Sequence, residues 1–569
     1  MEQEVKRGRS FLREAAILTV SNFAVKIIGV VFKIPLTNIL GQSIGVFNAA
    51  YSIYAMLFML STSGLPVAIS RLVSASNERG RGREADRISL LSGVAFGLIG
   101  LLFTVLLLVL APFVARVTGH PDSATAMRVI APSLLFICVC SSERGYYQGL
   151  HNMVPTAVSQ FIEAFFKMAV GLAAVYIAAS KGASVPVQAA CAISGVSVGE
   201  FFAMVYILIV RKLPHRSRPE YTDDSVRPDK TLIKAITLVA LPVTLTAAAL
   251  YFSQFLDTLI IVNVLESSGE THETAHTLYS AYTGLSVPLY DLLPATLVFP
   301  IATSILPAIS GARAVGHKKR AAKLTAQAIR LSGIIAVPCG VFLLVTGRWC
   351  ISLLYGAEKW NVPLQLASGA QMTALDSATY SLSVLAFAVF FISVVSTTNS
   401  LLNAYGRQHL PFISVLIGIA VLTGAEVGLL YSPLGIIGAA ASSLICYMLV
   451  TFINIRFLRK YCGVRLKLAG MFARPVLCGA ITALCVWLVR LGATALWKNL
   501  VSEDTLTRGA SLFILAVSGI VLVAVYCVTV IAFRAIKEDE IRLLPKGDRI
   551  ADALIKRNLI KSGEKTEVQ

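Results

Sequence analysis

Apolar stretches long enough to cross a membrane recur along the whole chain, and short polar loops separate them. A helix needs roughly 20 apolar residues to span a bilayer. The pattern predicts about fourteen spanning helices, at residues 14–38, 45–71, 88–114, 127–150, 155–179, 187–210, 234–264, 277–308, 325–347, 378–404, 411–431, 435–457, 474–492 and 509–534. We therefore expect an all-α polytopic membrane protein.

The loops between these segments alternate in charge. Loops rich in Lys and Arg fall at residues 1–13, 71–87, 211–234, 313–323, 456–474 and 534–569. The intervening loops contain few basic residues, and one of them, Glu266-Ser-Ser-Gly-Glu-Thr-His-Glu-Thr, is acidic. Because basic loops tend to stay on the cytoplasmic side of a membrane, this alternation predicts that both termini are cytoplasmic.

A long basic linker and a weak internal repeat indicate two lobes. The segment Tyr147-Gln-Gly-Leu-His-Asn-Met-Val-Pro155 is similar to Asn403-Ala-Tyr-Gly-Arg-Gln-His-Leu-Pro411. Such a parallel repeat predicts two pseudo-symmetric six-helix lobes, followed here by two C-terminal helices. The predicted parts are an N-terminus (1–13), an N-lobe (14–210), a cytoplasmic linker (211–233), a C-lobe (234–457), a helix pair (474–534) and a cytoplasmic amphipathic tail (535–569).

Composition excludes several classes of protein. The 569 residues are 56% hydrophobic and 14% charged, whereas soluble domains carry about 25% charged residues. The net charge of +19 does not indicate a nucleic-acid partner, because the basic residues lie in loops between apolar runs. The sequence contains no phosphate-binding loop of the Walker type and no dinucleotide fingerprint. The ten cysteines indicate packing rather than a disulfide framework.

The most unusual polar segment connects the fourth and fifth predicted helices. Glu143, Arg144, Gln148, Gln160 and Glu163 lie between two long apolar stretches. Ionised groups are costly at membrane depth and usually face a protein interior or a water-filled cavity. We therefore interpret these five side chains as candidates for binding a polar substrate.

Basic residues on other helices extend this candidate set. Lys26 and Lys33 are seven residues apart and so lie on nearly the same face of the first helix. Lys26 is expected to face a cavity, whereas Lys33 could instead snorkel to the outer surface. Arg71 ends the second helix, where a topology anchor is an alternative to a ligand group. Glu163 and Lys167, at i and i+4, could form an ion pair that only stabilises the bundle.

Two carboxylates in the predicted C-lobe are candidates for ion or proton coupling. Asp257 lies deep in the seventh helix, and no basic residue of that helix is near it. Asp291 lies in the eighth helix among four prolines, at positions 288, 294, 300 and 307. Proline removes a helix hydrogen bond, and such breaks are tolerated in membranes where protein or water satisfies the backbone. The eighth helix is thus the candidate bending element.

The sequence His272-Glu-Thr-Ala-His276 matches the zinc-protease pattern His-Glu-x-x-His. It lies in a short predicted external loop, and the sequence reveals no third ligand and no catalytic domain around it. We therefore assign no metal or catalytic role to it from sequence.

Three segments resemble one known family. Ser61-Thr-Ser-Gly-Leu-Pro-Val-Ala-Ile-Ser-Arg71, Arg144-Gly-Tyr-Tyr-Gln-Gly-Leu-His-Asn-Met-Val-Pro-Thr-Ala-Val-Ser-Gln160 and Leu256-Asp-Thr are similar to the polysaccharide-transport branch of the multidrug/oligosaccharidyl-lipid/polysaccharide exporter superfamily. Within it, the chain most resembles the stage V sporulation protein B group, which includes lipid II flippases of the MurJ type. The resemblance covers roughly residues 10 to 535.

The resemblance implies a flippase of the bacterial plasma membrane and not an enzyme. Its substrate would be an undecaprenyl-pyrophosphate-linked saccharide, such as lipid II or a related cell-wall precursor, moved to the outer leaflet by alternating access. The implied partners are that substrate and membrane lipids, with cell-wall synthesis proteins as further candidates. No cofactor is implied beyond a coupling Na⁺ or H⁺.

The resemblance also implies a cationic cavity for the pyrophosphate, with arginines from helices one, two and eight. This sequence offers Lys26, Lys33 and Arg71 on the first two helices, but its eighth helix carries Asp291 and no arginine. We hypothesise that Arg144 supplies the missing charge.

Two other functions are weighed against the flippase. A multidrug/cation antiporter of the same superfamily would need an anionic cavity, which Glu143, Glu163, Asp257 and Asp291 could form. A membrane glycosyl- or phosphotransferase would place its catalytic carboxylates in sizeable external loops, whereas the predicted external loops are short.

Overall fold

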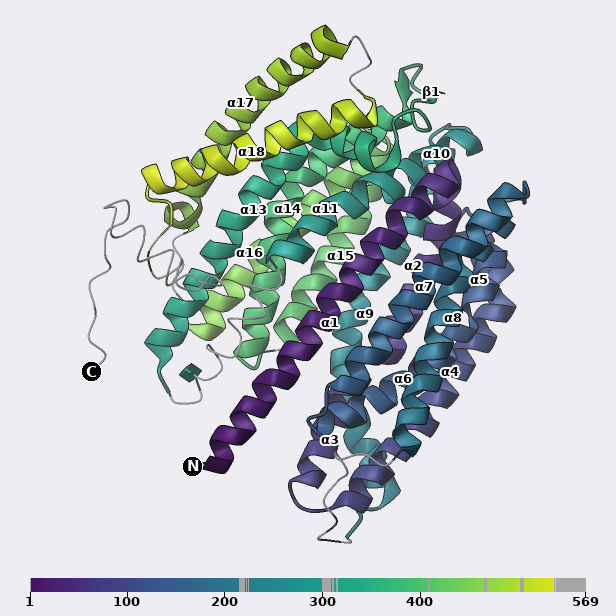
Figure 1. The fold of residues 1–569 in the computed structure, drawn as a ribbon, viewed down its shortest axis with the longest axis vertical. Coiled ribbons are helices and arrows are strands. Elements are labelled where there is room, and N and C mark those ends of the chain that lie inside the picture. Colours follow the sequence, from purple (N-terminus) through teal and green to yellow (C-terminus); the bar gives the residue numbers. More distant parts are fainter. Residues whose placement is uncertain are drawn as a thin grey trace. The chain divides into compact units, whose positions relative to one another are not determined.

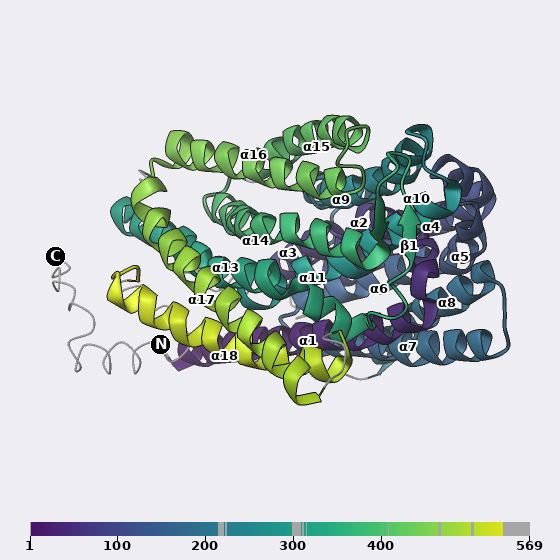
Figure 2. The ribbon, with the colours of Figure 1, turned by 90° about the horizontal axis from the view of Figure 1, so that it is seen from above.

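The computed structural model describes residues 2–213, 221, 223, 225–298, 309, 312–313, 316–407, 409–464, 468–501, 506–536 and 538. The chain divides into two compact units, Met1–Asn263 and Val264–Gln569, and both are built almost entirely of helices (Figures 1 and 2). Eleven segments of the described chain are helical, long and apolar enough to cross a membrane. The protein is therefore an all-α polytopic membrane protein.

The first unit is a bundle of long helices. Its elements are α1 (Glu2–Leu40), η1 (Gly41–Ser43), α2 (Ile44–Thr62), α3 (Leu65–Asn77), α4 (Gly82–Val117), η2 (Pro121–Ser123), α5 (Ala124–Ile130), α6 (Pro132–Gly149), α7 (Val154–Ser180), α8 (Val185–Lys212) and most of α9 (Asp229–Ser267). Helices α3, α6, α7 and α8 each begin with a proline in the first turn. Proline suits this position because the first turn needs no N–H donor.

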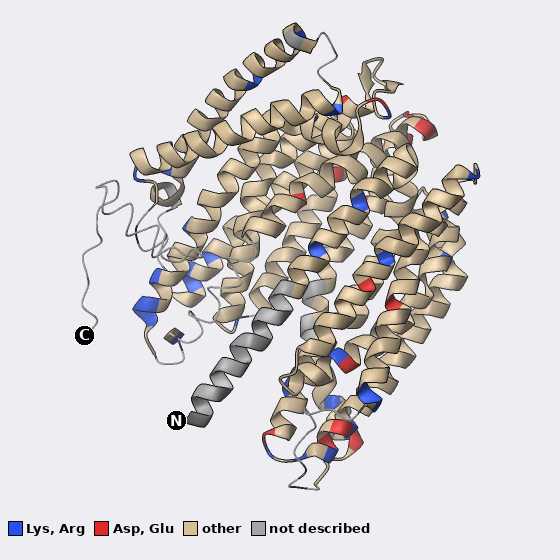
Figure 3. Cartoon of the chain, viewed as in Figure 1, with Lys and Arg blue, Asp and Glu red and all other residues tan. Residues whose placement is uncertain are grey.

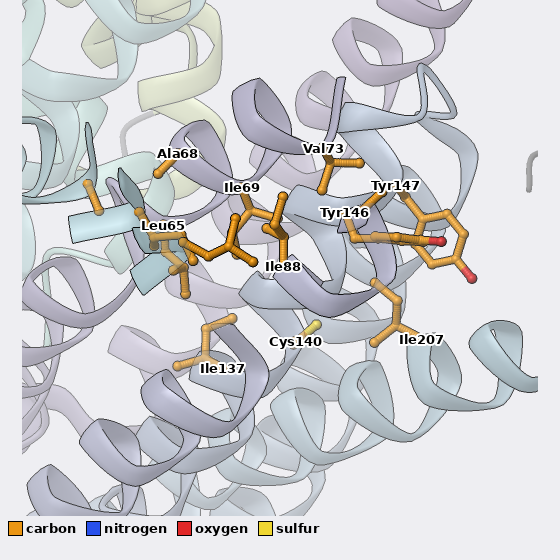
Figure 4. Close-up of a cluster of buried hydrophobic side chains, with 14 of the residues drawn as sticks. Leu65, Ala68, Ile69, Val73, Ile88, Ile137, Cys140, Tyr146, Tyr147 and Ile207 are labelled. Carbon is orange, nitrogen blue, oxygen red and sulfur yellow. The ribbon is translucent and has the colours of Figure 1, made fainter. Parts of the chain in front are cut away.

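A buried apolar cluster holds the first unit together next to its polar segment. Leu65 and Ile69 of α3, Ile88 of α4, Ile137 of α6 and Ile207 of α8 meet in this cluster, which Figure 4 shows in close-up. Helix α6 lies at its centre and packs against α3, α4 and α8. The polar face of α6 is therefore fixed by the burial of its apolar face.

The second unit contains two helical groups and a small hairpin. Its helices are α10 (His272–Ala281), α11 (Val287–Leu293), α13 (Lys318–Tyr355), α14 (Ala374–Ala404), α15 (His409–Leu430), α16 (Ile437–Cys462), α17 (Leu468–Val501) and α18 (Arg508–Ala532). Helices α13 to α16 pack side by side, and α17 and α18 pack on α13. An antiparallel hairpin of β1 (Pro363–Gln365) and β2 (Gln371–Thr373) follows α13. The apolar pattern did not predict this hairpin because its strands are only three residues each.

The predicted eighth helix is irregular where it is described. Two wide π-helical turns, η3 (Tyr282–Ser286) and η4 (Pro294–Val298), flank α11. Proline accounts for the second, because Pro294 cannot donate the regular helix hydrogen bond. Pro300 and Pro307 lie outside the described residues, as does the predicted amphipathic tail beyond residue 538.

Two boundaries differ from the predicted ones. The segment 45–71 breaks at Ser63–Gly64 into α2 and α3, because Gly64 lies directly against the α9 backbone at Ala240, where no side chain would fit. The contact boundary between units falls after Asn263 and not in the linker 211–233. Helix α9 joins the first unit through contacts such as the Ser52–Thr258 hydroxyl pair, at 2.9 Å.

Candidate functional site

Glu143 and Arg144 are neighbours on α6 but enter different polar networks. Successive residues on a helix point about 100° apart, so one face of α6 carries Arg144 toward α7 while the other carries Glu143 toward α4 and α8. The two networks have different compositions. Only the one around Arg144 lies well inside the bundle.

Arg144 forms a buried, charge-assisted contact with α7. Its Nη2 donates to Glu163 Oε2 at 2.9 Å and its Nε donates to Ser159 Oγ at 2.9 Å. Only 9% of the Arg144 side chain and 28% of the Glu163 side chain are exposed. The interpretation of Glu163 as the i, i+4 partner of Lys167 is therefore not what the structure shows, because the salt bridge of Glu163 is to Arg144 on a different helix.

Glu200 on α8 completes this group, although sequence reasoning missed it. Its side chain is 1% exposed and accepts a hydrogen bond from Tyr54 OH at 3.4 Å. Its carboxyl interacts electrostatically with Glu163, Arg144 and Lys167. We call Arg144, Ser159, Glu163, Lys167 and Glu200 the Arg144 cluster.

Close helix packing explains why Glu163 and Glu200 meet. Gly195 and Gly199 form a Gly-x-x-x-Gly stripe on α8, and a Cβ at Gly199 would lie 2.5 Å from the Glu163 carbonyl oxygen. Small residues in such a stripe let two helix backbones approach closely. This stripe, directly before Glu200, was the sequence signal that could have identified the residue.

Two lysines surround the cluster with positive charge. Lys167 Nζ donates to Tyr51 OH at 3.1 Å and lies 4.7 Å from the centre of that ring. Lys33 Nζ donates to Asn48 Oδ1 at 2.5 Å and lies 5.3 Å from the Phe47 ring centre. Lys33 therefore turns toward α2 instead of snorkelling outward. Cation–ring contacts of this kind hold an ammonium group where water is scarce.

The charges in this region do not cancel. Lys33, Arg144 and Lys167 provide three positive charges against two carboxyls, so one positive charge remains when both carboxyls are ionised, and Lys33 and Lys167 repel each other. Protonation of either carboxyl would raise the excess to two. The region is thus suited to an anion and not to a cation.

Glu143 belongs to a network near the end of the first unit. Its carboxyl accepts from Ser89 Oγ at 3.3 Å and lies 3.5 Å from Arg211 Nη1. Arg211 Nη2 also binds Asp86 at 3.1 Å, and its guanidinium stacks 3.6 Å from the Tyr146 ring centre. These contacts join α4, α6 and α8. Figure 3 shows charged positions gathered at this end of the unit.

The linker continues that network instead of forming a loose tether. Arg227 donates to Glu84 at 2.9 Å through its side chain and at 2.8 Å through its backbone N–H. Arg81 binds Asp223 at 2.8 Å. The Ser225 backbone N–H and hydroxyl, together with Arg81, lower the pKa of Asp223 from its ordinary 3.8 to about 2. The described part of the linker is therefore fixed to the start of α4.

The other predicted binding residues lie apart from the Arg144 cluster in these contacts. Lys26 and Arg71 are exposed on α1 and α3, and Gln148 is half-buried near the end of α6. Gln160 is half-buried on α7, one turn before Glu163, and its Oε1 atom is buried with no hydrogen-bond partner within the described part of the chain. Gln160 is the member of this group best placed to receive a ligand hydroxyl.

The two predicted coupling carboxylates belong to different units and environments. Asp257 is half-buried on α9 in the first unit, and the next residue, Thr258, bonds Ser52 of α2. Asp291 is exposed on α11 in the second unit. The environment of Asp257 fits a coupling group better, because it lies among the helices that carry the Arg144 cluster.

Neutral side chains replace this charge in the interior of the second unit. Asn454 on α16 donates to Thr398 at 3.0 Å and to Asn399 at 2.8 Å on α14. At the sequence offset of the internal repeat, Arg144 corresponds to Ser400 on the same helix. Both copies of the repeat form helix–helix turns, with His151 at φ 56° and Gly406 at φ 71°. The repeat thus accounts for the turn but not for the charges.

Comparisons with known proteins agree with this architecture. The sequence profile of a family described as "Polysaccharide biosynthesis protein" matches residues 11–312. Stage V sporulation protein B of Bacillus subtilis (strain 168) is 27% identical over 94% of this chain and 98% of its own length. The lipid II flippase MurJ of the same organism is 23% identical, over 91% of this chain and 94% of its own length.

A solved structure extends the likeness to the fold. The structure titled "Lipid II flippase MurJ, inward closed conformation" matches with a TM-score of 0.65 at 14% identity, over 91% of this chain and 99% of that chain. The resemblance inferred from residues 61–71, 144–160 and 256–258 is therefore confirmed at the level of family and fold.

Proposed function

Because the chain belongs to the polysaccharide biosynthesis protein family, we propose that it is a flippase for a lipid-linked saccharide precursor. The similar proteins named above include a lipid II flippase. A head group with a pyrophosphate and sugars cannot cross about 30 Å of hydrocarbon unaided. The observation that carries the proposal is the excess positive charge around Arg144 inside a membrane-spanning bundle.

The contacts suggest how the charged groups divide the work. Arg144 already donates to Glu163 and Ser159, so its role is to hold the carboxyls. Lys33 and Lys167 contact only neutral oxygens and rings in the described structure, which leaves their charge available to phosphate oxygens. Ammonium groups are effective phosphate partners as point charges. We propose that these lysines bind the pyrophosphate and that Gln160 bonds a sugar hydroxyl.

Translocation in proteoliposomes tests this assignment. A fluorescent undecaprenyl-pyrophosphate-linked saccharide is reconstituted with the protein, and the labelled head group reaching the outer leaflet is measured. Loss of a charge-assisted hydrogen bond costs about 1.5–3 kcal/mol, so Lys33→Ala and Lys167→Ala should each slow translocation by roughly ten- to a hundredfold. Lys212→Ala, at the exposed end of α8, is the matched control. Normal translocation by a Lys33→Ala/Lys167→Ala double variant would refute the assignment.

The finer identity of the glycan needs a separate experiment. We propose lipid II or a related cell-wall precursor as the substrate. Expression of the chain in a strain depleted of its lipid II flippase should restore growth. Failure there, with translocation of another lipid-linked saccharide in vesicles, would keep the flippase function and reject lipid II.

The antiporter alternative is not favoured by these contacts. It required an anionic cavity, but Glu163 is paired with Arg144 and Glu143 lies beside Arg211. The net charge around the Arg144 cluster is positive when both of its carboxyls are ionised. Energy coupling is part of our proposal, with Na⁺ or H⁺ at Asp257.

A further inference from the structure

The turn between α9 and α10 brings three metal-ligating side chains together. Glu266 lies in the last turn of α9, and His272 and His276 lie on α10. One ligand atom from each of these residues falls within 4.8 Å of the other two. Sequence reasoning found the histidine pair but no third ligand, because Glu266 precedes the pair and approaches it only when the chain reverses.

Local structure explains why the three side chains converge. Gly269, at φ 101°, turns the chain directly after α9. Thr271 then caps α10 by accepting a hydrogen bond from the Thr274 backbone N–H, so the first turn of α10 is fixed. His272 and His276 follow at i and i+4 and share one face of the helix. Their ring centres are 4.2 Å apart.

The contact between Glu266 and His272 shows that the side chains already point at one another. Glu266 Oε1 and His272 Nδ1 are 2.5 Å apart and share a proton. A tetrahedral zinc site with ligand bonds near 2.0–2.2 Å has ligand atoms about 3.4 Å apart. The three atoms are therefore within a side-chain adjustment of that geometry. A metal ion would take the place of the shared proton.

The surrounding charge also favours a cation. The sequence contains no Lys or Arg between Lys234 and Arg313, whereas Glu270 and Glu273 flank the three ligands. These carboxylates offset the positive end of the α10 dipole, which would otherwise repel a cation at a helix N-terminus. His272 is exposed, and Glu266 and His276 are half-buried, so an ion has access from solvent.

We propose that Glu266, His272 and His276 form a binding site for a zinc-like transition-metal ion. Two imidazoles and one carboxylate are a common donor set for zinc, with water as the fourth ligand. The ion would connect the end of α9 to the start of α10 and so stiffen the turn just after the boundary between the compact units. This site is separate from the Arg144 cluster, and the inference does not rest on the proposed transport function.

Zinc titration of the full-length protein tests the site. The protein is purified in detergent without a polyhistidine tag and titrated with zinc alone in a calorimeter. We expect one zinc ion to bind per chain, and binding to weaken more than about tenfold in His276→Ala and Glu266→Gln. Binding should also weaken below about pH 6.5, because the histidines must be neutral to ligate.

Matched variants separate a metal site from a simple hydrogen-bonded pair. Glu273→Gln removes the same charge from the same turn, and His409→Ala removes an exposed histidine at the start of α15; both should bind zinc nearly as the parent does. Zinc should raise the Tm of the parent and not that of His276→Ala. No zinc binding by the parent, or equal binding by His276→Ala, would overturn the proposal and leave only the Glu266–His272 hydrogen bond.

Discussion

Arg144 holds two buried carboxyls at once, so its loss should cost more stability than that of a surface arginine. It bonds Glu163 directly and attracts Glu200, whose side chain is 1% exposed. Breaking a buried ion pair by removing one partner costs about 3–5 kcal/mol, because the remaining charge stays buried. Arg144→Ala should therefore lower the Tm of the detergent-solubilised protein markedly.

A second substitution tests that reason. Arg144→Ala/Glu163→Gln removes the stranded charge as well and should recover part of the lost Tm, as a double-mutant cycle would report. Translocation should remain impaired in both variants, since the cluster no longer holds Glu200 in the same electrostatic environment. An equal Tm for the single and double variants would contradict the coupling between these residues.

Asp223 gives a pH-dependent prediction for the linker. Its pKa of about 2 lies below the ordinary 3.8, so the native contacts favour the ionised form. The contribution is present above about pH 4 and is lost as the pH falls through about 2. Hydrogen exchange at the Ser225 amide, which donates to Asp223 at 2.8 Å, should lose protection over that range once intrinsic rates are corrected. In Asp223→Asn this pH dependence should disappear.

At the scale of elements, glycine stripes decide which polar residues meet. The stripe noted first in such a sequence, Gly93 and Gly97 on α4, makes only ordinary contacts, with Ser142 and Val139. The tightest approaches occur on α8, beside Glu163 and Lys167, as described above. Glycine spacing in the sequence predicts that two helices can pack closely, but it does not say which partner helix is chosen. Glu200 could not be identified without that partner.

Substitution on α8 should therefore affect the cluster through packing. A Cβ at Gly199 would clash with the Glu163 carbonyl oxygen at 2.5 Å, so Gly199→Val should lower Tm and reduce translocation by separating α7 from α8. The matched control is Gly424→Ala on α15, where no atom lies within 4 Å of the added Cβ. That change should be neutral or raise stability by about 0.5–1 kcal/mol, because alanine is the better helix former. A tolerated Gly199→Val would show that the close approach is dispensable.

At the scale of the whole molecule, hydropathy predicted the helices but not their interruptions. The long segments near 88–114, 155–179 and 378–404 lie within α4, α7 and α14. The segments at 45–71 and 277–308 contain breaks, because Gly64 packs on another backbone and prolines interrupt the second. Such interruptions depend on neighbours distant in sequence. The same dependence explains why Arg144 and Glu163 could be named from sequence while their pairing could not.

The two candidate coupling carboxylates give the last prediction, which concerns the complete transport cycle. Asp257 is half-buried on α9 beside the helices of the Arg144 cluster, whereas Asp291 is exposed on α11. A carboxylate inside a bundle can exchange a proton or Na⁺ as helices rearrange, and an exposed one has less reason to change its state. In proteoliposomes with an imposed Na⁺ or H⁺ gradient, Asp257→Asn should abolish gradient-stimulated translocation while substrate binding at equilibrium stays within about twofold, and Asp291→Asn should retain most of the stimulation. The reverse result would place coupling in the second unit, and an unstimulated parent protein would instead indicate a cycle driven by the membrane potential or by the substrate gradient alone.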